Sequence, residues 1–215
     1  MTNDIFEAFD VGKSVLLVAL DQSAAFDCLD HHILLERLQH TYCLAGSVLD
    51  WLQSYLSSRQ SFVKWRSYSS SSTAVDTGVP QGSSLGPQLF SIYIAPLAGL
   101  IRSFGVRYHQ YADDSQLYVS VSGNNQDTQL ATLEQCLSKI HDWLLHNGLS
   151  PNPAKSNAVQ FATGRGRRDV VESISVSGAA IKPAASVKCL GVTLDSRLSL
   201  DQHITNVCKS CYYHI

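Results

Sequence analysis

The feature that most limits the fold is a short apolar run, SVLLVAL at residues 14–20, which ends at the acidic residue Asp21. A continuous apolar run of this length, bounded by polar residues, is typical of a β-strand that is buried on both faces. The chain has 215 residues, of which 45% are apolar and 16% charged, so it is long enough to bury a core. The same composition excludes a mostly disordered chain.

Helices and antiparallel strands are mixed along the rest of the sequence, without a regular strand–helix–strand rhythm. Apolar spacing predicts helices at residues 31–40, 47–57, 88–101 and 127–146, and the beginning of another at 200–215. Alternating or apolar runs predict further strands at 60–66, 73–79, 106–111, 115–121, 157–162, 172–177 and 187–194. The serine-rich segment 67–72 is expected to be the exposed loop of a hairpin. The mixture points to the α+β class.

Charge and cysteine content narrow the function classes. The net charge is −2, which excludes a protein that binds nucleic acid through bulk positive charge, although a local basic surface is compatible with it. Six scattered cysteines are typical of reduced intracellular thiols, not of a small disulfide scaffold. No segment approaches the roughly 20 apolar residues that cross a bilayer, and the N-terminus has no signal-peptide pattern. We therefore expect an intracellular protein without a membrane partner.

Two acidic sites carry potential chemistry. Asp21 ends the apolar strand, and Asp113-Asp114 lies between two predicted strands. Carboxylates gathered at strand ends repel one another unless cations lie between them, and Mg²⁺ prefers such hard oxygen ligands. A pair of ions of this kind activates an attacking oxygen and stabilises a leaving pyrophosphate. The alternative is structural: Asp113-Asp114 favours a turn, and Asp21 caps the next element.

Five segments resemble the ordered motifs A to E of reverse transcriptases. They are VALDQSAAFDCLDHHIL at 18–34, GVPQGSSLGPQLFSIYI at 78–94, YADD at 111–114, NGLSPNPAKS at 147–156 and VKCLGVTLD at 187–195. YADD alone would be a weak signal, because four residues recur by chance. The motifs occur in the family's order with ordinary gaps, and motifs A and B are most similar to those of non-LTR (LINE-type) retrotransposons.

The resemblance implies an RNA-directed DNA polymerase that adds dNTPs to a primer 3′-OH by a two-metal mechanism. The expected fold is an α+β polymerase palm, an antiparallel sheet packed on helices, formed by residues 1–215 with part of the fingers and without a thumb. The implied partners are an RNA template, a DNA primer and dNTPs, together with the fingers and thumb segments that pack on a palm in the family. Two Mg²⁺ ions, or Mn²⁺ in their place, are the implied cofactors. Such proteins assemble on RNA in the cytoplasm and act at chromosomal DNA in the nucleus.

Two other functions are compatible with the motifs. The first is a truncated, catalytically inactive remnant that keeps the palm fold and binds RNA or a protein partner. The second is an RNA-templated RNA polymerase. The bulky residue Phe26 argues against the second function, because RNA synthesis needs room for the 2′-OH of the nucleotide.

The resemblance assigns the catalytic roles residue by residue. Asp21 matches the metal-binding aspartate of motif A, and Asp113 and Asp114 match the aspartates of motif C, so all three are expected to bind metal. Lys155 matches the motif D lysine that is proposed to protonate pyrophosphate. A lysine in a loop after a helix is otherwise simply solvated.

Substrate-binding roles follow in the same way. Phe26 matches the residue that excludes the ribonucleotide 2′-OH, although without the motif it would be interpreted as a core aromatic. Gln81 and Gly82 match the motif B pair that approaches the incoming nucleotide and the template base, where a glycine allows close backbone contact. Leu190 and Gly191 match the motif E hairpin that supports the primer terminus.

Some residues depart from the pattern or have a second interpretation. The departures are Gln22, Cys28 and Ser84, which replace residue types that are common in the family. The basic loop Arg165–Arg168 is expected either to contact phosphates or to be solvated. Four residues near the C-terminus are spaced like the ligands of a zinc site: His203, Cys208, Cys211 and His214. Their spacing is equally the i, i+3 spacing of one face of a helix, and we favour the helical interpretation.

Overall fold

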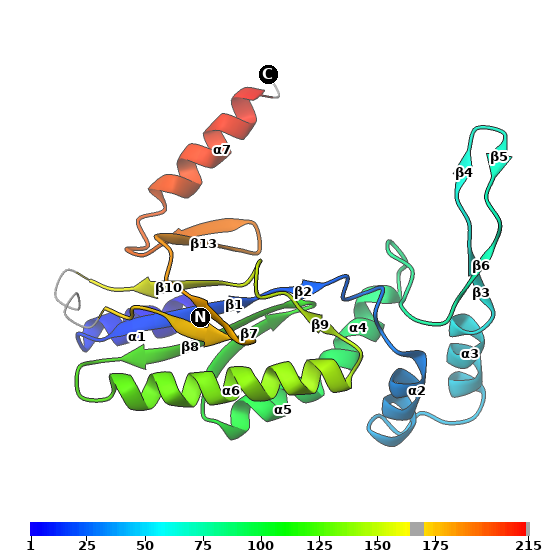
Figure 1. The fold of residues 1–215 in the computed structure, drawn as a ribbon, viewed down its shortest axis with the longest axis horizontal. Coiled ribbons are helices and arrows are strands. Elements are labelled where there is room, and N and C mark those ends of the chain that lie inside the picture. Colours follow the sequence, from blue (N-terminus) through cyan, green and yellow to red (C-terminus); the bar gives the residue numbers. More distant parts are fainter. Residues whose placement is uncertain (164–169, 214–215) are drawn as a thin grey trace. The chain divides into compact units, whose positions relative to one another are not determined.

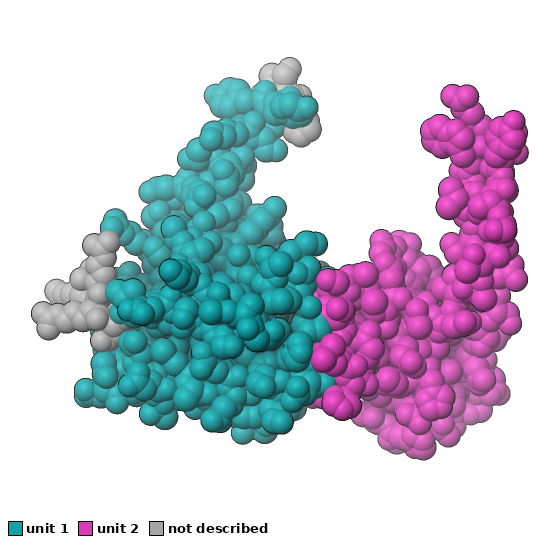
Figure 2. Space-filling view, in the orientation of Figure 1, with its two compact units in different colours: residues 1–21, 97–142, 151–215 teal, residues 22–96, 143–150 magenta. Residues whose placement is uncertain are grey.

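The computed structural model describes residues 1–163 and 170–213. The chain divides into two compact units (Figure 2). Unit 1 comprises residues 1–21, 97–142 and 151–215, and unit 2 comprises residues 22–96 and 143–150. Each unit is therefore assembled from segments that are far apart in the sequence.

Unit 1 is built on a four-stranded antiparallel sheet (Figure 1). Its strand order is β10 (Asn157–Phe161), β1 (Ser14–Leu20), β8 (Asp114–Val121) and β7 (Arg107–Tyr111). The apolar run predicted as a buried strand forms β1, with the predicted bounds, and it has a strand on each side. Its residues 15–18 are at most 1% exposed, as expected for a strand covered on both faces.

Both faces of this sheet are covered. On one face Val15 and Leu17 pack in a cluster with α1 (Thr2–Asp10) and with a hairpin of β13 (Ser186–Cys189) and β14 (Val192–Asp195). Leu16 and Val18 alternate to the other face, where α5 (Pro96–Ser103) and α6 (Gln126–His146) lie (Figure 1). Sheet and helices confirm the predicted α+β class.

The remaining elements of unit 1 come after β10 in the chain. A short hairpin pairs β11 (Ile174–Val176) with β12 (Ala179–Ile181), and α7 (Asp201–Tyr213) begins after β14. The segment 187–194, predicted as one strand, is instead the β13–β14 hairpin. The chain reverses there because Leu190 and Gly191 adopt positive φ values of 47° and 84°. The sequence analysis did not predict α1.

Unit 2 contains three helices and a long hairpin. The helices are α2 (His31–His40), α3 (Ser47–Leu56) and α4 (Gly86–Ile94), and short strands lie at β2 (Gln22–Ser23) and β9 (Ser150–Pro151). The apolar segment 88–101 was predicted as one helix, but it is divided between α4 and α5. The division falls before Pro96, which has no N–H with which to continue the hydrogen bonds of α4.

The hairpin of unit 2 is called the arm and covers residues 59–75. Its base pairs β3 (Arg59–Ser61) with β6 (Thr73–Val75), and its tip pairs β4 (Lys64–Trp65) with β5 (Tyr68–Ser69). The hairpin was predicted, but the serine-rich segment 67–72 was expected to be only loop. Strand β5 lies inside it, so the turn at the tip is shorter than predicted.

A half-buried arginine holds the helices of unit 2 together. The Arg37 guanidinium on α2 donates hydrogen bonds to the backbone oxygen of Tyr93 and to Oδ1 of Asn147. Its Cζ lies 4.5 Å from the ring centroid of Tyr93 and 5.3 Å from that of Trp143. We call these four residues the Arg37 clip. They join α2, α4, the last turn of α6 and Asn147, which follows that helix.

In unit 1, α1 is attached to the sheet through Asp4. Tyr118 on β8 donates a hydrogen bond to Oδ2 of Asp4, and Nη1 of Arg107 on β7 lies 3.6 Å from Oδ1. The hydrogen bond from Tyr118, opposed by burial and aided by nearby positive charge, lowers the pKa of Asp4 below its ordinary value of 3.8. The attachment is therefore stronger when Asp4 is ionised.

We expect the stability cost of Asp4→Ala to depend on pH. Because the folded-state pKa lies below the unfolded one, the ionised group stabilises the fold above the unfolded value, and this contribution is lost as pH falls through the folded pKa. Urea unfolding should show the variant less stable than the parent near pH 6, and the difference should shrink below about pH 4. Asp10→Ala, on the same helix, is the control. A cost that is equal at both pH values would contradict the role of the Asp4 charge.

Within the described residues, no helix combines the length and the apolar character needed to cross a bilayer.

Candidate active site

The sheet of unit 1 brings the two acidic sites to the same end. Strands β1 and β8 pair in a register that ends at Leu20 opposite Ser115, and one further step places Asp21 opposite Asp114. On the other side of β8, Tyr111 pairs with Asp114, so Ala112 and Asp113 form the turn. The three aspartates therefore lie at adjacent strand ends, although about 90 residues separate the two sites in sequence.

Electrostatic effects agree with this proximity. Burial, together with the negative charges of Asp113 and Asp21, raises the pKa of Asp114, whose side chain nevertheless remains exposed. Oδ2 of Asp21 is buried and has no hydrogen-bond partner. A buried carboxylate oxygen without a partner is costly, and a cation would relieve both that cost and the repulsion between the carboxylates.

The carboxylate oxygens at this end of the sheet suit Mg²⁺, which keeps water and phosphate ligands. They suit less well a metal whose ligands all come from the protein. Among the residues that the structure describes, no group of three or more His, Cys, Asp or Glu side chains is already arranged to hold a metal ion. Mg²⁺ is usually held by one or two carboxylates, with water and substrate phosphates completing its coordination. Asp21, Asp113 and Asp114 supply hard ligands of that kind.

A turn within the segment 147–156 fixes the backbone of Asp21, a role that the sequence analysis did not predict for it. The N–H of Asn152 donates to the carbonyl oxygen of Asp21 at 2.9 Å, and the N–H of Asp21 donates to Oγ of Ser156 at 3.1 Å. Oγ of Ser156 in turn donates to the carbonyl oxygen of Asn152 at 2.9 Å. Lys155 belongs to this turn and has an exposed side chain, so motif D holds Asp21 as well as presenting its lysine.

The turn between β7 and β8 is strained. Ala112 has a φ of 51°, in the left-handed region that favours glycine. An L-residue with a Cβ pays about 1 kcal/mol or more to adopt this conformation. Such strain persists only when the surrounding structure enforces it, and it often marks functional positions. Here it accompanies the turn that presents Asp113.

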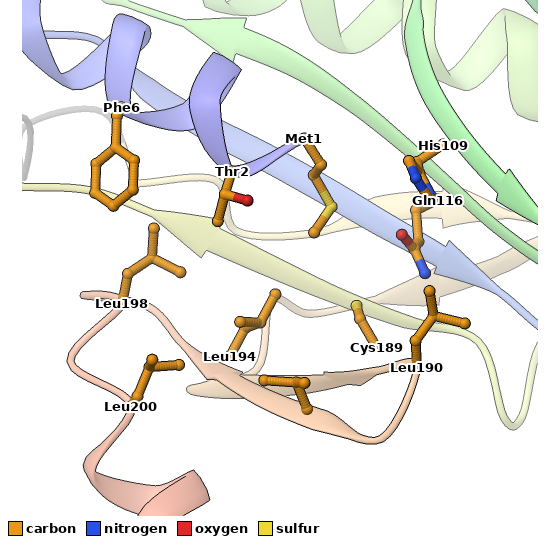
Figure 3. Close-up of a pocket in the computed structure, with 11 residues that line it drawn as sticks. Met1, Thr2, Phe6, His109, Gln116, Cys189, Leu190, Leu194, Leu198 and Leu200 are labelled. Carbon is orange, nitrogen blue, oxygen red and sulfur yellow. The ribbon is translucent and has the colours of Figure 1, made fainter.

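The β13–β14 hairpin borders a cavity of about 520 Å³ between it and the sheet of unit 1 (Figure 3). Leu190 and Cys189 line it from the hairpin, and the cross-strand pair His109 and Gln116 lines it from the sheet. Burial and the negative charge of Asp114 raise the pKa of the Cys189 thiol to about 11. Leu190 and Gly191 therefore belong to a hairpin that lies near Asp114 within unit 1.

The other predicted substrate residues lie in unit 2. The ring of Phe26 stacks on that of Phe90, with centroids 4.7 Å apart. Nε2 of Gln81 donates to the carboxylate of Asp27, at 3.2 Å from Oδ2. Gly82 has a φ of 79°, and a Cβ there would meet nothing within 4 Å, so its backbone is open to an approaching ligand.

The loops that carry Phe26 and Gln81 are joined by a close backbone contact. The N–H of Val79 donates to the carbonyl oxygen of Phe26 at 2.9 Å. A Cβ on Gly78 would lie 2.7 Å from the carbonyl oxygen of Asp27, and Gly78 has a φ of 80°. Only glycine satisfies both conditions. Asp27 was not a predicted site residue; the pairing of its carboxylate with Gln81 becomes visible only in the fold.

The zinc interpretation of the C-terminal segment has no support in the described residues. His203, Cys208 and Cys211 lie on α7, which confirms the helical interpretation of their spacing, and Nδ1 of His203 accepts from the N–H of Thr193 at 3.5 Å. His214 lies outside the described residues. So does the basic loop Arg165–Arg168, which was predicted either to contact phosphates or to be solvated.

Comparisons with known proteins identify one family. The family described as "Reverse transcriptase (RNA-dependent DNA polymerase)" matches residues 2–194. The "Probable RNA-directed DNA polymerase from transposon BS" of Drosophila melanogaster is 29% identical, over 99% of this chain and 23% of its own length. The "RNA-directed DNA polymerase from mobile element jockey" of the same species is 28% identical, over 96% of this chain and 22% of its own length. The chain thus spans about a quarter of these relatives.

Solved structures show the same fold. Apo telomerase from Candida tropicalis, truncated from its C-terminal domain, aligns with a TM-score of 0.63 and 16% identity, over 93% of this chain and 37% of that one. Telomerase from the same species in complex with a fragment of telomeric RNA aligns with the same TM-score at 13% identity, over 93% of this chain and 31% of that one. These likenesses confirm the predicted polymerase palm.

Proposed function

Because the chain belongs to the reverse transcriptase (RNA-dependent DNA polymerase) family, we propose that residues 1–215 form the palm and part of the fingers of an RNA-directed DNA polymerase from a non-LTR retrotransposon. The observation that supports this function best is the meeting of Asp21, Asp113 and Asp114 at one end of the sheet. The names of the mobile-element relatives and the RNA-bound telomerase support an RNA template as partner. The proposed compartment is intracellular.

The three aspartates would hold two Mg²⁺ ions, or Mn²⁺ in their place. The buried, unpartnered Oδ2 of Asp21 and the raised pKa of Asp114 are what a site prepared for cations would have. When bound, the ions neutralise phosphate charge and polarise the reacting oxygens. The turn 152–156 keeps the backbone of Asp21 in place, so its carboxylate starts close to its working position.

The remaining residues would position the substrates of a template-directed addition, in which the primer 3′-oxygen attacks a dNTP and pyrophosphate leaves. Phe26 would exclude a 2′-OH by steric conflict, and Gln81 and Gly82 would lie against the incoming nucleotide and template base. Leu190 and Gly191 would support the primer end, and Lys155 would donate a proton to the leaving pyrophosphate.

Primer extension tests this function directly. The parent chain is incubated with poly(rA), an oligo(dT) primer, dTTP and Mg²⁺, beside an Asp113→Asn/Asp114→Asn double variant. Extension by the parent and none by the double variant is the expected result. Equal extension by both would overturn the site. Absence of extension by a folded parent would favour the alternative function, an inactive remnant that keeps the palm fold.

Replacing Phe26 with valine is expected to reduce the selectivity for deoxynucleotides by at least about tenfold, because the shorter side chain leaves room for a 2′-OH. The measurement compares extension with dUTP and with UTP, which differ only in that hydroxyl. Phe9→Val on α1, which removes the same atoms from another partly buried ring, is the control. An unchanged ratio in the Phe26 variant would identify Phe26 as a core aromatic that packs on Phe90.

A further inference from the structure

The arm (residues 59–75) differs in charge from the rest of the protein. It contains three basic residues, Arg59, Lys64 and Arg66, and no acidic one. The rest of the chain has 13 basic and 18 acidic residues. The arm projects from the end of α3 and stands clear of the other elements of unit 2 (Figures 1 and 2). It is therefore a local positive surface on a protein that is negative overall.

Large rings are displayed at the tip of the arm. Trp65 and Tyr68 face each other across β4 and β5 and are 70% and 77% exposed. Phe62 is 57% exposed, and the guanidinium of Arg66 lies 5.8 Å from the ring centroid of Trp65. Rings that were needed for the protein's own core would be covered, so these are available to a partner.

The tip is ordered enough to present these rings in a fixed arrangement. Apart from the two short ladders, the N–H of Ser70 donates to the carbonyl oxygen of Val63, and the N–H of Val63 donates to Oγ of Ser70, both at 2.9 Å. These bonds join the two sides of the hairpin between its base and its tip. A partner would thus meet a preformed surface and would pay little ordering entropy.

We propose that the arm is a binding surface for a single-stranded nucleic acid, with bases stacking on Trp65 and Tyr68 and phosphates contacting Lys64 and Arg66. Exposed aromatic rings interleaved with cations suit such a strand, since every base has a π face and every linkage an anion. Duplexes bury those faces in their own stack, so they would gain only the contacts to the cations. The absence of any carboxylate on the arm removes the repulsion that phosphates would otherwise meet.

The base of the arm connects this surface with the predicted nucleotide-binding residues of unit 2. A cavity of about 300 Å³ lies there, lined by Arg59 and Ser61 of β3, by Val75 of β6, and by Asp27 and Gln81. From Arg59 to Trp65 the arm spans about 20 Å at the usual rise of a strand. If the strand on the arm is the template, a role that rests on the proposed polymerase function, it would be led toward Gln81.

The test measures binding without synthesis. The full chain is titrated into a fluorescein-labelled single-stranded oligo(rU) of about 12 nucleotides in EDTA, without dNTPs, and anisotropy is recorded at several salt concentrations. Trp65→Leu is expected to weaken binding about tenfold, because leucine stays apolar but cannot stack, whereas Trp65→Phe should weaken it less. The double variant Lys64→Gln/Arg66→Gln should reduce the slope of log K against log salt by about 1.4.

Matched controls lie in the other unit. Tyr212→Leu changes an exposed ring of α7, and Lys182→Gln/Lys209→Gln neutralises two exposed cations, so both should bind as the parent does. Binding that survives the arm substitutions, or that is as tight for a duplex of the same length, would overturn the proposal. So would equal affinities of the parent and the Trp65→Leu variant, because bases would then not stack on Trp65. The Asp21→Asn chain should bind normally, so failure of catalysis and failure of the arm surface are distinguishable.

Discussion

Replacing Asp21 with asparagine is expected to lower primer extension at least about thousandfold without loosening the fold. The substitution keeps the size of the side chain but removes the charge of Asp21, whose buried Oδ2 has no hydrogen-bond partner. It also removes one of the two charges that raise the pKa of Asp114, so the metal-free protein should be at least as stable as the parent. Loss of activity together with retained stability is the pattern of a site built for function at the expense of stability.

Thermal unfolding with and without Mg²⁺ supplies the second measurement for this variant. An ion that binds only the folded state raises the melting temperature of the parent. The Asp21→Asn chain should respond less, whereas Asp10→Asn, an exposed aspartate on α1, should behave as the parent in both assays. Extension within tenfold of the parent, or an undiminished response to Mg²⁺, would remove Asp21 from the metal site.

Breaking the Arg37 clip is expected to cost about 3 to 4 kcal/mol of unfolding free energy. Arg37→Leu removes two charge-assisted hydrogen bonds, to the backbone oxygen of Tyr93 and to Oδ1 of Asn147, and leaves both acceptors in a buried setting. It also removes the guanidinium from the rings of Tyr93 and Trp143. In urea the unfolding midpoint should fall by about 1 to 2 M.

The clip also reaches the chain next to a predicted substrate-binding residue. The hydroxyl of Tyr93 accepts from the N–H of Asp30 at 3.4 Å and donates to the carbonyl oxygen of Asn147 at 2.5 Å, so it holds the loop that follows Phe26. Arg37→Lys keeps the charge but not the planar fork and should lose an intermediate amount of stability. Arg102→Leu, an exposed arginine of α5, should change stability by less than about 0.5 kcal/mol. Equal midpoints for the Arg37 and Arg102 variants would contradict the role of the clip.

The local sequence pattern was sufficient to predict the helices and strands with strong periodicity. The bounds of β1 and α2 were predicted to the residue, because an apolar run and an amphipathic repeat each specify one structure. The apolar segment 88–101 misled the prediction, since apolar content does not show that Pro96 begins a second helix. At 187–194 the reversal depends on Leu190 in a conformation that is unusual for leucine, which no pattern of hydrophobicity reveals.

The sequence was sufficient to predict which residues carry the chemistry of the candidate site, but not the hydrogen bonds that hold them in place. The motifs named the three aspartates, and the turn at Asp113 follows from the strands on either side of it. The hydrogen bonds of Asn152 and Ser156 to Asp21 join residues more than 130 positions apart, and the pairing of Asp27 with Gln81 spans 54. Contacts of this kind are set by tertiary structure, so they become visible only when the fold is known.

The order of strands in the sheet of unit 1 has a consequence for synthesis on the ribosome. Strand β1 is complete at Leu20, but its partner β8 begins only at Asp114, and β10 follows still later. At translation rates of 5 to 20 residues per second, the most apolar strand waits about 5 to 20 s for its first neighbour. During that interval SVLLVAL is an unpaired, uncharged segment of the kind that joins other nascent chains. The apolar strand between β8 and β10 is thus also a segment that is open to aggregation during synthesis.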